Sequence, residues 1–243
     1  MGWITSWGEY MGDIKYYLEI AKEETKLAFS NNKTLLFISI LLFVIPMLIG
    51  YFCANEISEY VKPIVDAFEQ QVKDGTVTLT THSLFTNNVT VAFILYALAA
   101  LGGVLGAIIL ANNGLFIGYY GVNFDIYAYL ALTLPHGIFE IPAIIIATTG
   151  GFVLLSFMLK FIWNLISPDL SYLDIFDPYF SDVKITPKQR VYAAFKKNQD
   201  KIKESFILLC ISVVLLIIAA FIEANVTLPL ASWLFSMFGL SLV

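Results

Sequence analysis

The chain has 243 residues, of which 58% are hydrophobic and only 14% are charged; its formal net charge is -5 and its mean hydropathy +0.78. Soluble domains are roughly half apolar and about a quarter charged, so this composition excludes an ordinary soluble protein. The sequence contains no basic patch with interleaved aromatic residues, which excludes nucleic acid as a partner. The apolar residues are gathered into long runs, which predicts an integral membrane protein with the lipid bilayer as its partner.

The first 33 residues predict an amphipathic helix. They are mixed and acidic, whereas a cleavable signal peptide is basic at first and then apolar. Apolar residues recur at every third or fourth position from Trp3 to Ala21, with Trp and Tyr near the start. This pattern is typical of a helix that lies in the membrane interface.

Five segments are candidates for crossing the bilayer, which takes about 20 consecutive apolar residues. The strong candidates are Thr34 to Ala54, Thr90 to Ala111, Ile141 to Trp163 and Phe206 to Ile222. Another candidate, Leu115 to Leu134, is weaker because it contains Asn123 and Asp125. The expected fold is therefore all-α, a polytopic transmembrane helix bundle of about five spans with amphipathic interfacial helices.

Lysine and arginine predict the orientation, because they concentrate in the cytoplasmic loops of membrane proteins. Residues 1–33 contain four of them, residues 55–89 two, residues 112–140 none and residues 160–205 eight. The N-terminus and the 164–205 loop are therefore expected in the cytoplasm. An even number of crossings separates two segments on one side, so residues 115–134 must cross too. Five crossings then place the C-terminus of this multi-pass protein outside the cell membrane.

The whole chain, 1–243, is expected to form a single integral membrane domain. Its parts are a cytoplasmic interfacial helix (1–33), four spans (34–163) with an outer amphipathic loop (55–89), a cytoplasmic loop (164–205), and the last span with an apolar tail (206–243). Apolar positions from Ile57 to Val72 predict a helix in the outer loop. Thr186, Pro187 and Gln189 match the start of a helix that continues into the last span. The tail, interrupted by Pro229, could lie in the interface, re-enter the membrane or form a dimer contact.

Small residues in the spans, among them Gly106 and Gly118, predict close helix packing, within the chain in preference to a dimer contact. Asn112, Asn113 and Gly114 have the chemistry of a turn, since Asn and Gly tolerate positive φ. We expect this turn to end the second span and to lead directly into the third. The alternative interpretation has Asn113 lining a polar cavity.

The segment TLPHGIFEIPA places two ionisable groups between apolar runs. If Pro135 lies in the first turn of a helix, His136 and Glu140 share one face, whereas Pro142 either kinks or breaks that helix. Three roles compete: a structural polar clasp, a path for a solute or ion, and a metal or catalytic site. His136 and Glu140 are weak metal candidates, because two ligands are too few and His82 lies in the outer loop. We therefore expect neither a bound metal nor another cofactor.

Two further acidic residues lie in or beside the predicted spans. Glu223 ends the last span at the depth of Glu140, and we expect His136 to contact one of these carboxylates. Gly137 would then allow backbone or another helix to pass close. Asp125 falls near the middle of the weak span, where burying an unpaired acid costs about 3 kcal/mol, although a short or tilted span would let it reach water. The candidate site is a polar intramembrane cluster of His136, Gly137, Glu140, Glu223, Asn113 and Asp125.

The segments ANNGLFIGYYG, LPHGIFEIPAIIIATTGG and IAAFIEANVTLP, with NN before the first span, together resemble the stage II sporulation protein M family. The resemblance runs from the first span to Pro229 and implies a multi-span membrane fold without an established enzyme activity. The family's hallmark positions match Asn113, Gly114, Pro135, His136, Gly137, Glu140 and Glu223, whereas Asp125 is not part of the pattern. The bacterial namesake is a membrane scaffold in engulfment during sporulation, with peptidoglycan-degrading partners. Many relatives occur in organisms that form no spores, including archaea, so the sporulation role is not carried over.

These observations predict a non-catalytic membrane protein, a scaffold or membrane-remodelling factor that associates with itself or with another membrane protein. The first alternative is a channel or transporter that uses Asp125, His136, Glu140 and Glu223 and has a continuous polar cavity. The second is an intramembrane metal-dependent hydrolase, which needs a third ligand near His136. A scaffold is expected to have a large apolar surface for self-association instead.

Overall fold

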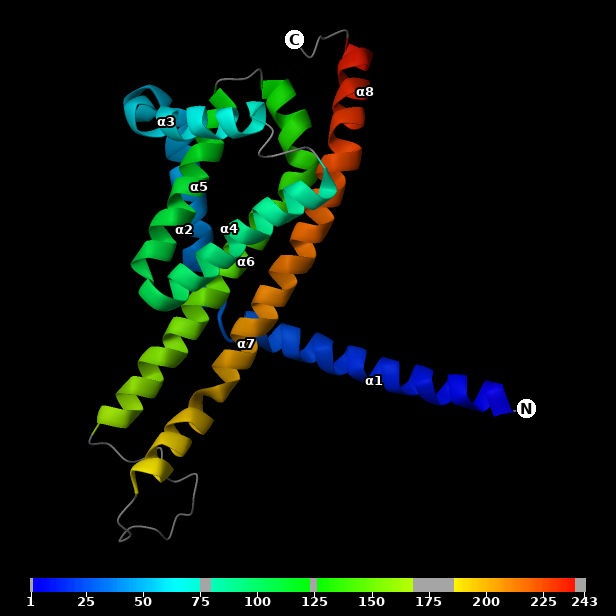
Figure 1. The fold of residues 1–243 in the computed structure, drawn as a ribbon, viewed down its shortest axis with the longest axis vertical. Helices are drawn as coiled ribbons and strands as arrows, with labels where there is room; N and C mark the ends of the chain where they lie inside the picture. Colours follow the sequence, from blue (N-terminus) through cyan, green and yellow to red (C-terminus); the bar gives the residue numbers. More distant parts are fainter. Residues whose placement is uncertain (1, 75–79, 123–125, 168–185, 239–243) are drawn as a thin grey trace.

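A computed structural model describes residues 2–74, 80–122, 126–167 and 186–238, and these residues form helices without strands. The elements are α1 (Gly2–Ser30), α2 (Lys33–Phe52), α3 (Ala54–Lys73), α4 (Thr81–Gly102), α5 (Val104–Val122), α6 (Ile126–Ile166), α7 (Pro187–Ile222), a π-helical turn η2 (Glu223–Thr227) and α8 (Leu228–Phe238). Among the described residues, α2, α4, α5, α6 and α7 are long and apolar enough to cross a membrane. The predicted all-α fold with five membrane-capable helices is therefore confirmed (Figure 1).

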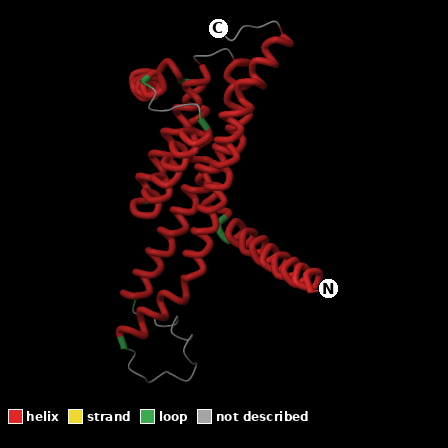
Figure 2. The backbone as a smooth tube through the Cα atoms, turned by 45° about the vertical axis from the view of Figure 1, so that its right-hand side comes forward, coloured by secondary structure: helices red, strands yellow, loops and turns green. Residues whose placement is uncertain are grey.

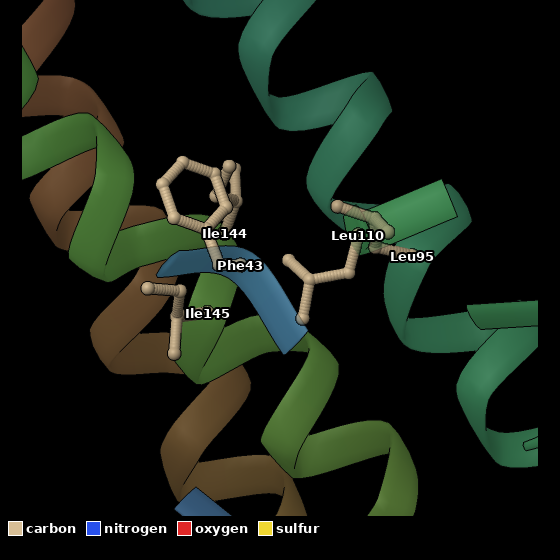
Figure 3. Packing of buried hydrophobic residues seen from close by; sticks show 5 residues of the cluster. All are labelled: Phe43, Leu95, Leu110, Ile144 and Ile145. Carbon is tan, nitrogen blue, oxygen red and sulfur yellow. The ribbon is translucent and has the colours of Figure 1, made fainter. Parts of the chain in front are cut away.

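The five long helices lie along one axis, whereas α1 projects sideways from the bundle and α3 lies across one end (Figures 1 and 2). The most extensive contacts join α6 to α7, α2 to α5 and α4 to α6. A core of apolar side chains fills the space where α2, α4, α5 and α6 meet (Figure 3). Its buried members are Phe43, Leu95, Leu110, Ile144 and Ile145. Apolar packing at the centre of these four helices therefore holds the bundle together.

The boundaries predicted for the second and third spans are wrong. The predicted span Thr90 to Ala111 contains a turn, because α4 ends at Gly102 and α5 begins at Val104. Gly103 has a φ of 46°, which glycine adopts without steric cost. Asn112, Asn113 and Gly114, the residues of the predicted turn, lie inside α5 instead. Hydropathy alone could not find the true turn, because both of its sides are apolar.

The third predicted span, Leu115 to Leu134, is not a single helix either, because α5 ends at Val122 and α6 begins at Ile126. The helix α6 then continues for 41 residues and includes both Pro135 and Pro142. Of the two alternatives at Pro142, a kink or a break in the helix, the break is therefore wrong, because the helix is continuous there. Membrane helices tolerate proline where neighbouring groups satisfy the freed backbone.

Glycines bring α2 and α5 into close contact. A Cβ atom at Gly114 would collide with the backbone oxygen of Phe43, and one at Gly118 with that of Met47. The contact is reciprocal, because a Cβ at Gly50 of α2 would collide with the backbone oxygen of Leu115. The prediction that the small residues pack helices within the chain is thus confirmed.

Helices α6 and α7 continue together past the level of α1 (Figure 1). We call this extension, residues 152–166 of α6 and 187–203 of α7, the arm. It is held by Phe161 and Leu165 of α6, which pack on Ala193 and Ala194 of α7. The end of the bundle from which the arm extends is called the basic end, and the opposite end, which carries α3 and α8, the far end (Figure 1).

Three sequence predictions about helices outside the spans are confirmed. Thr186 and Gln189 form a capping box at the start of α7, and α7 continues through the last span as expected. The predicted outer-loop helix is α3, whose Val61 and Val65 are buried against Tyr119 of α5. The N-terminal segment is the helix α1. The tail, which the sequence left open, continues from α7 through η2 into α8.

Candidate functional site

Three ionisable side chains converge near the far end of the bundle, where α6 meets the junction of α7 and η2. His136 and Glu140 share one face of α6 because they are four residues apart. Glu223 is the first residue of η2, and one ligand atom from each of the three lies within 4.8 Å of the others. The distance from His136 Nε2 to Glu140 Oε2 is 3.9 Å, and their side chains are 14% and 30% exposed. The predicted proximity of these three residues is therefore found in the structure.

The π-helical turn η2 positions the side chain of Glu223 and also that of Thr227, a fourth residue beside the site. Turns of this kind are rare and frequently occur at functional sites. In η2 the hydroxyl of Thr227 donates to the carbonyl of Ile222 at 3.2 Å and lies 3.4 Å from His136 Nδ1. Since that hydroxyl has given its one proton to Ile222, it can only accept from the histidine, so Nδ1 carries the proton. The other ring nitrogen, Nε2, lies on the side of Glu140, 3.9 Å from its Oε2.

A groove of about 750 Å³ lies beside this site, between α6 and α8. It is lined by apolar residues of α6, among them Leu134, Pro135 and Ile138, and of α8, among them Leu230 and Leu234. Pro135 is the neighbour of His136 in the chain, so the groove and the polar site share a short segment of α6. A surface of this composition suits an acyl chain or an apolar side chain and not a hydrated ion.

Two other predicted members of the cluster, Asn113 and Gly137, contribute nothing to the converging set. The side chain of Asn113 donates to the carbonyl of Ile109 in its own helix at 2.8 Å. A Cβ at Gly137 would meet only side-chain atoms of Thr133 and Ile141, at 3.6 and 3.9 Å. These are ordinary contact distances within one helix, so the predicted close passage of another helix at Gly137 is wrong. Asp125 lies outside the described residues.

Sequence reasoning missed a second polar site, at the basic end, which we call the Glu204 cluster (Asn31, Asn32, Lys201 and Glu204). Glu204 is only 4% exposed. Its carboxylate accepts hydrogen bonds from Asn31 Nδ2 at 2.6 Å, Asn32 Nδ2 at 2.7 Å and Lys201 Nζ at 2.7 Å. Lys201 also donates to Asn32 Oδ1 at 2.9 Å. The cluster thus fastens the link between α1 and α2 to α7.

The neighbouring residue extends this fastening across the bundle. Ser205 Oγ donates to the carbonyl of Gly150 in α6 at 2.7 Å and lies 2.8 Å from the hydroxyl of Tyr96 in α4. The available sequence signal was the pair Asn31-Asn32 just before the first span, together with an acid just before the last. Glu204 follows a basic helical stretch, and a charged sequence of this kind predicts a solvated surface. Only the tertiary contacts show that Glu204 is buried.

Comparisons with known proteins agree with the family resemblance. A model of the family described as Stage II sporulation protein M matches residues 39–228. Uncharacterized protein MJ0706 of Methanocaldococcus jannaschii is 28% identical over 224 residues, which cover 88% of this chain and 91% of that protein. Uncharacterized protein MJ0793 of the same organism is 30% identical over 161 residues, which cover 63% of this chain and 73% of that protein. No solved structure matches the chain.

Proposed function

The chain belongs to the stage II sporulation protein M family, and we propose that it is a non-catalytic membrane scaffold that assembles with copies of itself through the arm. In this proposal the basic end faces the cytoplasm, because lysine and arginine concentrate there. The helix α8 is then on the outer side. The sideways helix α1 lies along the cytoplasmic surface of the bilayer, consistent with its direction in Figure 1.

The observation that supports self-association through the arm is an exposed apolar stripe on its α6 helix. Leu159, Ile162, Trp163 and Ile166 follow the i, i+3, i+4, i+7 spacing of one helix face, and they are 49% to 69% exposed. Helices in bundles and coiled coils pack through stripes of this spacing. A second copy presents the same stripe, so two arms are self-complementary about a two-fold axis.

The arm lies beyond the hydrocarbon layer because α6 is too long to fit within it. Its 41 residues correspond to about 60 Å, whereas the hydrocarbon core is about 30 Å thick. The partner helix in the arm carries Lys188, Lys196 and Lys203, which would be costly to place in hydrocarbon. An exposed apolar stripe outside lipid is the usual sign of a protein contact.

The channel alternative receives less support from the groove beside His136. A channel or transporter requires polar groups along a path to the middle of the membrane, whereas the side chains that line this groove are apolar. The hydrolase alternative required a third ligand near His136, and Glu223 occupies that position. A third ligand makes a metal site feasible without making the protein an enzyme, because closed metal sites are commonly structural.

Self-association can be tested by cross-linking in membranes and by light scattering of the purified chain in mild detergent. Replacing both Leu159 and Trp163 with alanine is expected to weaken association roughly tenfold or more, because exposed Trp residues at interfaces carry much of the binding energy. The matched control is Trp233→Ala, which removes a Trp of similar exposure, 56% against 65% for Trp163, from α8. This control should assemble like the wild type.

Two results would contradict the scaffold proposal in this form. One is a wild-type chain that is monomeric both in membranes and in detergent. The other is a Leu159/Trp163 variant that assembles as well as the wild type, which would move the contact away from the arm. Selective ion flux through vesicles that contain the purified chain would instead support the channel alternative.

A further inference from the structure

The three converging side chains His136, Glu140 and Glu223 have the chemistry of a cation site. Two carboxylates and one imidazole offer ligand atoms within 4.8 Å of one another. Four-coordinate Zn²⁺ places its nitrogen and oxygen ligands about 3.3 Å apart, given bond lengths near 2.0–2.2 Å. Small rotations about the side-chain bonds close the remaining difference. Two helical segments, α6 and η2, would share the ion.

The hydrogen bonding of His136 prepares the ring as a ligand. With Thr227 accepting from Nδ1–H, a neutral His136 ring has its lone pair on Nε2, on the side of the ring where Glu140 lies 3.9 Å away. Metal-binding histidines usually donate their second ring nitrogen to an oxygen in this way, which sets the tautomer and the ring orientation. The Thr227 hydroxyl therefore occupies the supporting position of a metal site.

The carboxylates at the site also favour the binding of a cation. Glu140 and Glu223 lie close together, and the ion pairs of Lys26, Lys201 and Lys203 involve other acids, Glu23, Glu204 and Glu24. A divalent ion between two carboxylates offsets their mutual repulsion in a medium of low dielectric constant. When both carboxylates are ionised they carry two negative charges, against which His136 alone supplies at most one positive charge.

We propose that His136, Glu140 and Glu223 bind one divalent metal ion of the Zn²⁺ class, with Thr227 as a positioning residue. The imidazole nitrogen favours Zn²⁺ over Mg²⁺ and Ca²⁺, which prefer sites made of oxygen only. The ion links the first third of α6 to the turn that leads into α8, so it holds α8 in place along the groove. This site is separate from the arm and does not depend on self-association.

The test uses the full-length chain, purified in detergent and stripped of metal with a chelator. Zn²⁺ alone is the probe, with bound metal measured after dialysis and the unfolding temperature measured with and without Zn²⁺. The wild type is expected to bind one equivalent and to unfold at a higher temperature with Zn²⁺. His136→Asn and Glu223→Gln should lose both effects, and Thr227→Val should weaken binding about 10- to 100-fold.

The matched control is His82→Asn, which removes the other histidine, an exposed residue near the start of α4. It should bind Zn²⁺ like the wild type, and equal binding by His136→Asn and the wild type would overturn the proposal. If the variants of the site do not fold, Co²⁺ added to the His82→Asn chain decides the question. Visible d–d absorption bands that Zn²⁺ abolishes support the site, and their absence overturns it.

Discussion

The carboxylate of Glu204 shows how much a single buried charge can organise in this protein. It receives hydrogen bonds from two asparagines and one lysine, and these come from the α1–α2 link and from α7. Lys203, the residue before it, pairs with Glu24 of α1 at 2.6 Å on the exposed side. The exposed pair adds little to stability, whereas the buried carboxylate holds its donors in one arrangement.

Replacing Glu204 with glutamine is expected to destabilise the protein by about 3 kcal/mol. The amide keeps the shape of the side chain but leaves Lys201, which is 21% exposed, without its counter-ion. Thermal unfolding in detergent measures the effect. The control is Asp200→Asn, which removes an exposed acid one turn earlier on α7 and should change stability by less than about 0.5 kcal/mol. Similar losses in the two variants would show that Glu204 acts only through the overall charge.

At the scale of elements, α3 is held to the bundle by one apolar face. Val61 and Val65 are 1% and 6% exposed and pack on Tyr119, while Ile64 on another face is 42% exposed. The helix is therefore a part of the packed structure and not a solvated insertion between spans.

This packing predicts different outcomes for a charge on the two faces of α3. Val61→Glu is expected to cost about 3 kcal/mol or more of folding stability, because the carboxylate would be buried without a partner. Ile64→Glu places the same group where it reaches solvent or lipid headgroups and should be tolerated. The two variants are compared by unfolding temperature and by yield of folded protein. Equal tolerance would mean that α3 does not pack on α5 in the membrane.

The elements that could be predicted from the sequence are those with periodic or capping signals. The apolar repeats of α1 and α3 and the capping box of Thr186 and Gln189 each depend on local chemistry. The turn at Gly103 could not be predicted, because it interrupts an apolar run that looks like one span. The number of membrane-capable helices was still predicted correctly, since moving the turn from residues 112–114 to residue 103 leaves that number unchanged.

The candidate site was predictable only where residues on one helix determine the geometry. The pairing of His136 with Glu140 follows from their spacing, and the depth of Glu223 follows from counting residues along the last span. The role of Thr227 depends on the π-helical turn, which no apolar pattern indicates. The asparagine partners of Glu204 come from a segment about 170 residues away, so only the folded structure reveals them.

For the molecule as a whole, the two polar clusters on α7 and η2 are as far apart along the helix as an apolar layer is thick. The 19 residue steps from Glu204 to Glu223 correspond to about 28 Å along a helix, close to the roughly 30 Å of a bilayer's hydrocarbon core. The helices α2, α4 and α5, with 20, 22 and 19 residues, have matching lengths. The arm of α6 and α7 and the sideways helix α1 lie toward the same end of the molecule (Figure 2), which in the proposed arrangement is at or beyond the cytoplasmic surface of the bilayer.

The orientation of the protein in the membrane is a prediction from the charges at the two ends of the bundle. The basic end contains the lysines of α1 and the arm, and such residues stay on the cytoplasmic side. In a chain whose Cys53 and Cys210 are replaced by alanine, a cysteine at Asp74 should react with an impermeant maleimide on intact cells. A cysteine at Lys197 should react only after the membrane is opened, and the cysteine-free chain should not react at all. The reverse pattern would invert the molecule and place the arm outside. Labelling of both sites on intact cells would mean that the five membrane-capable helices do not all cross.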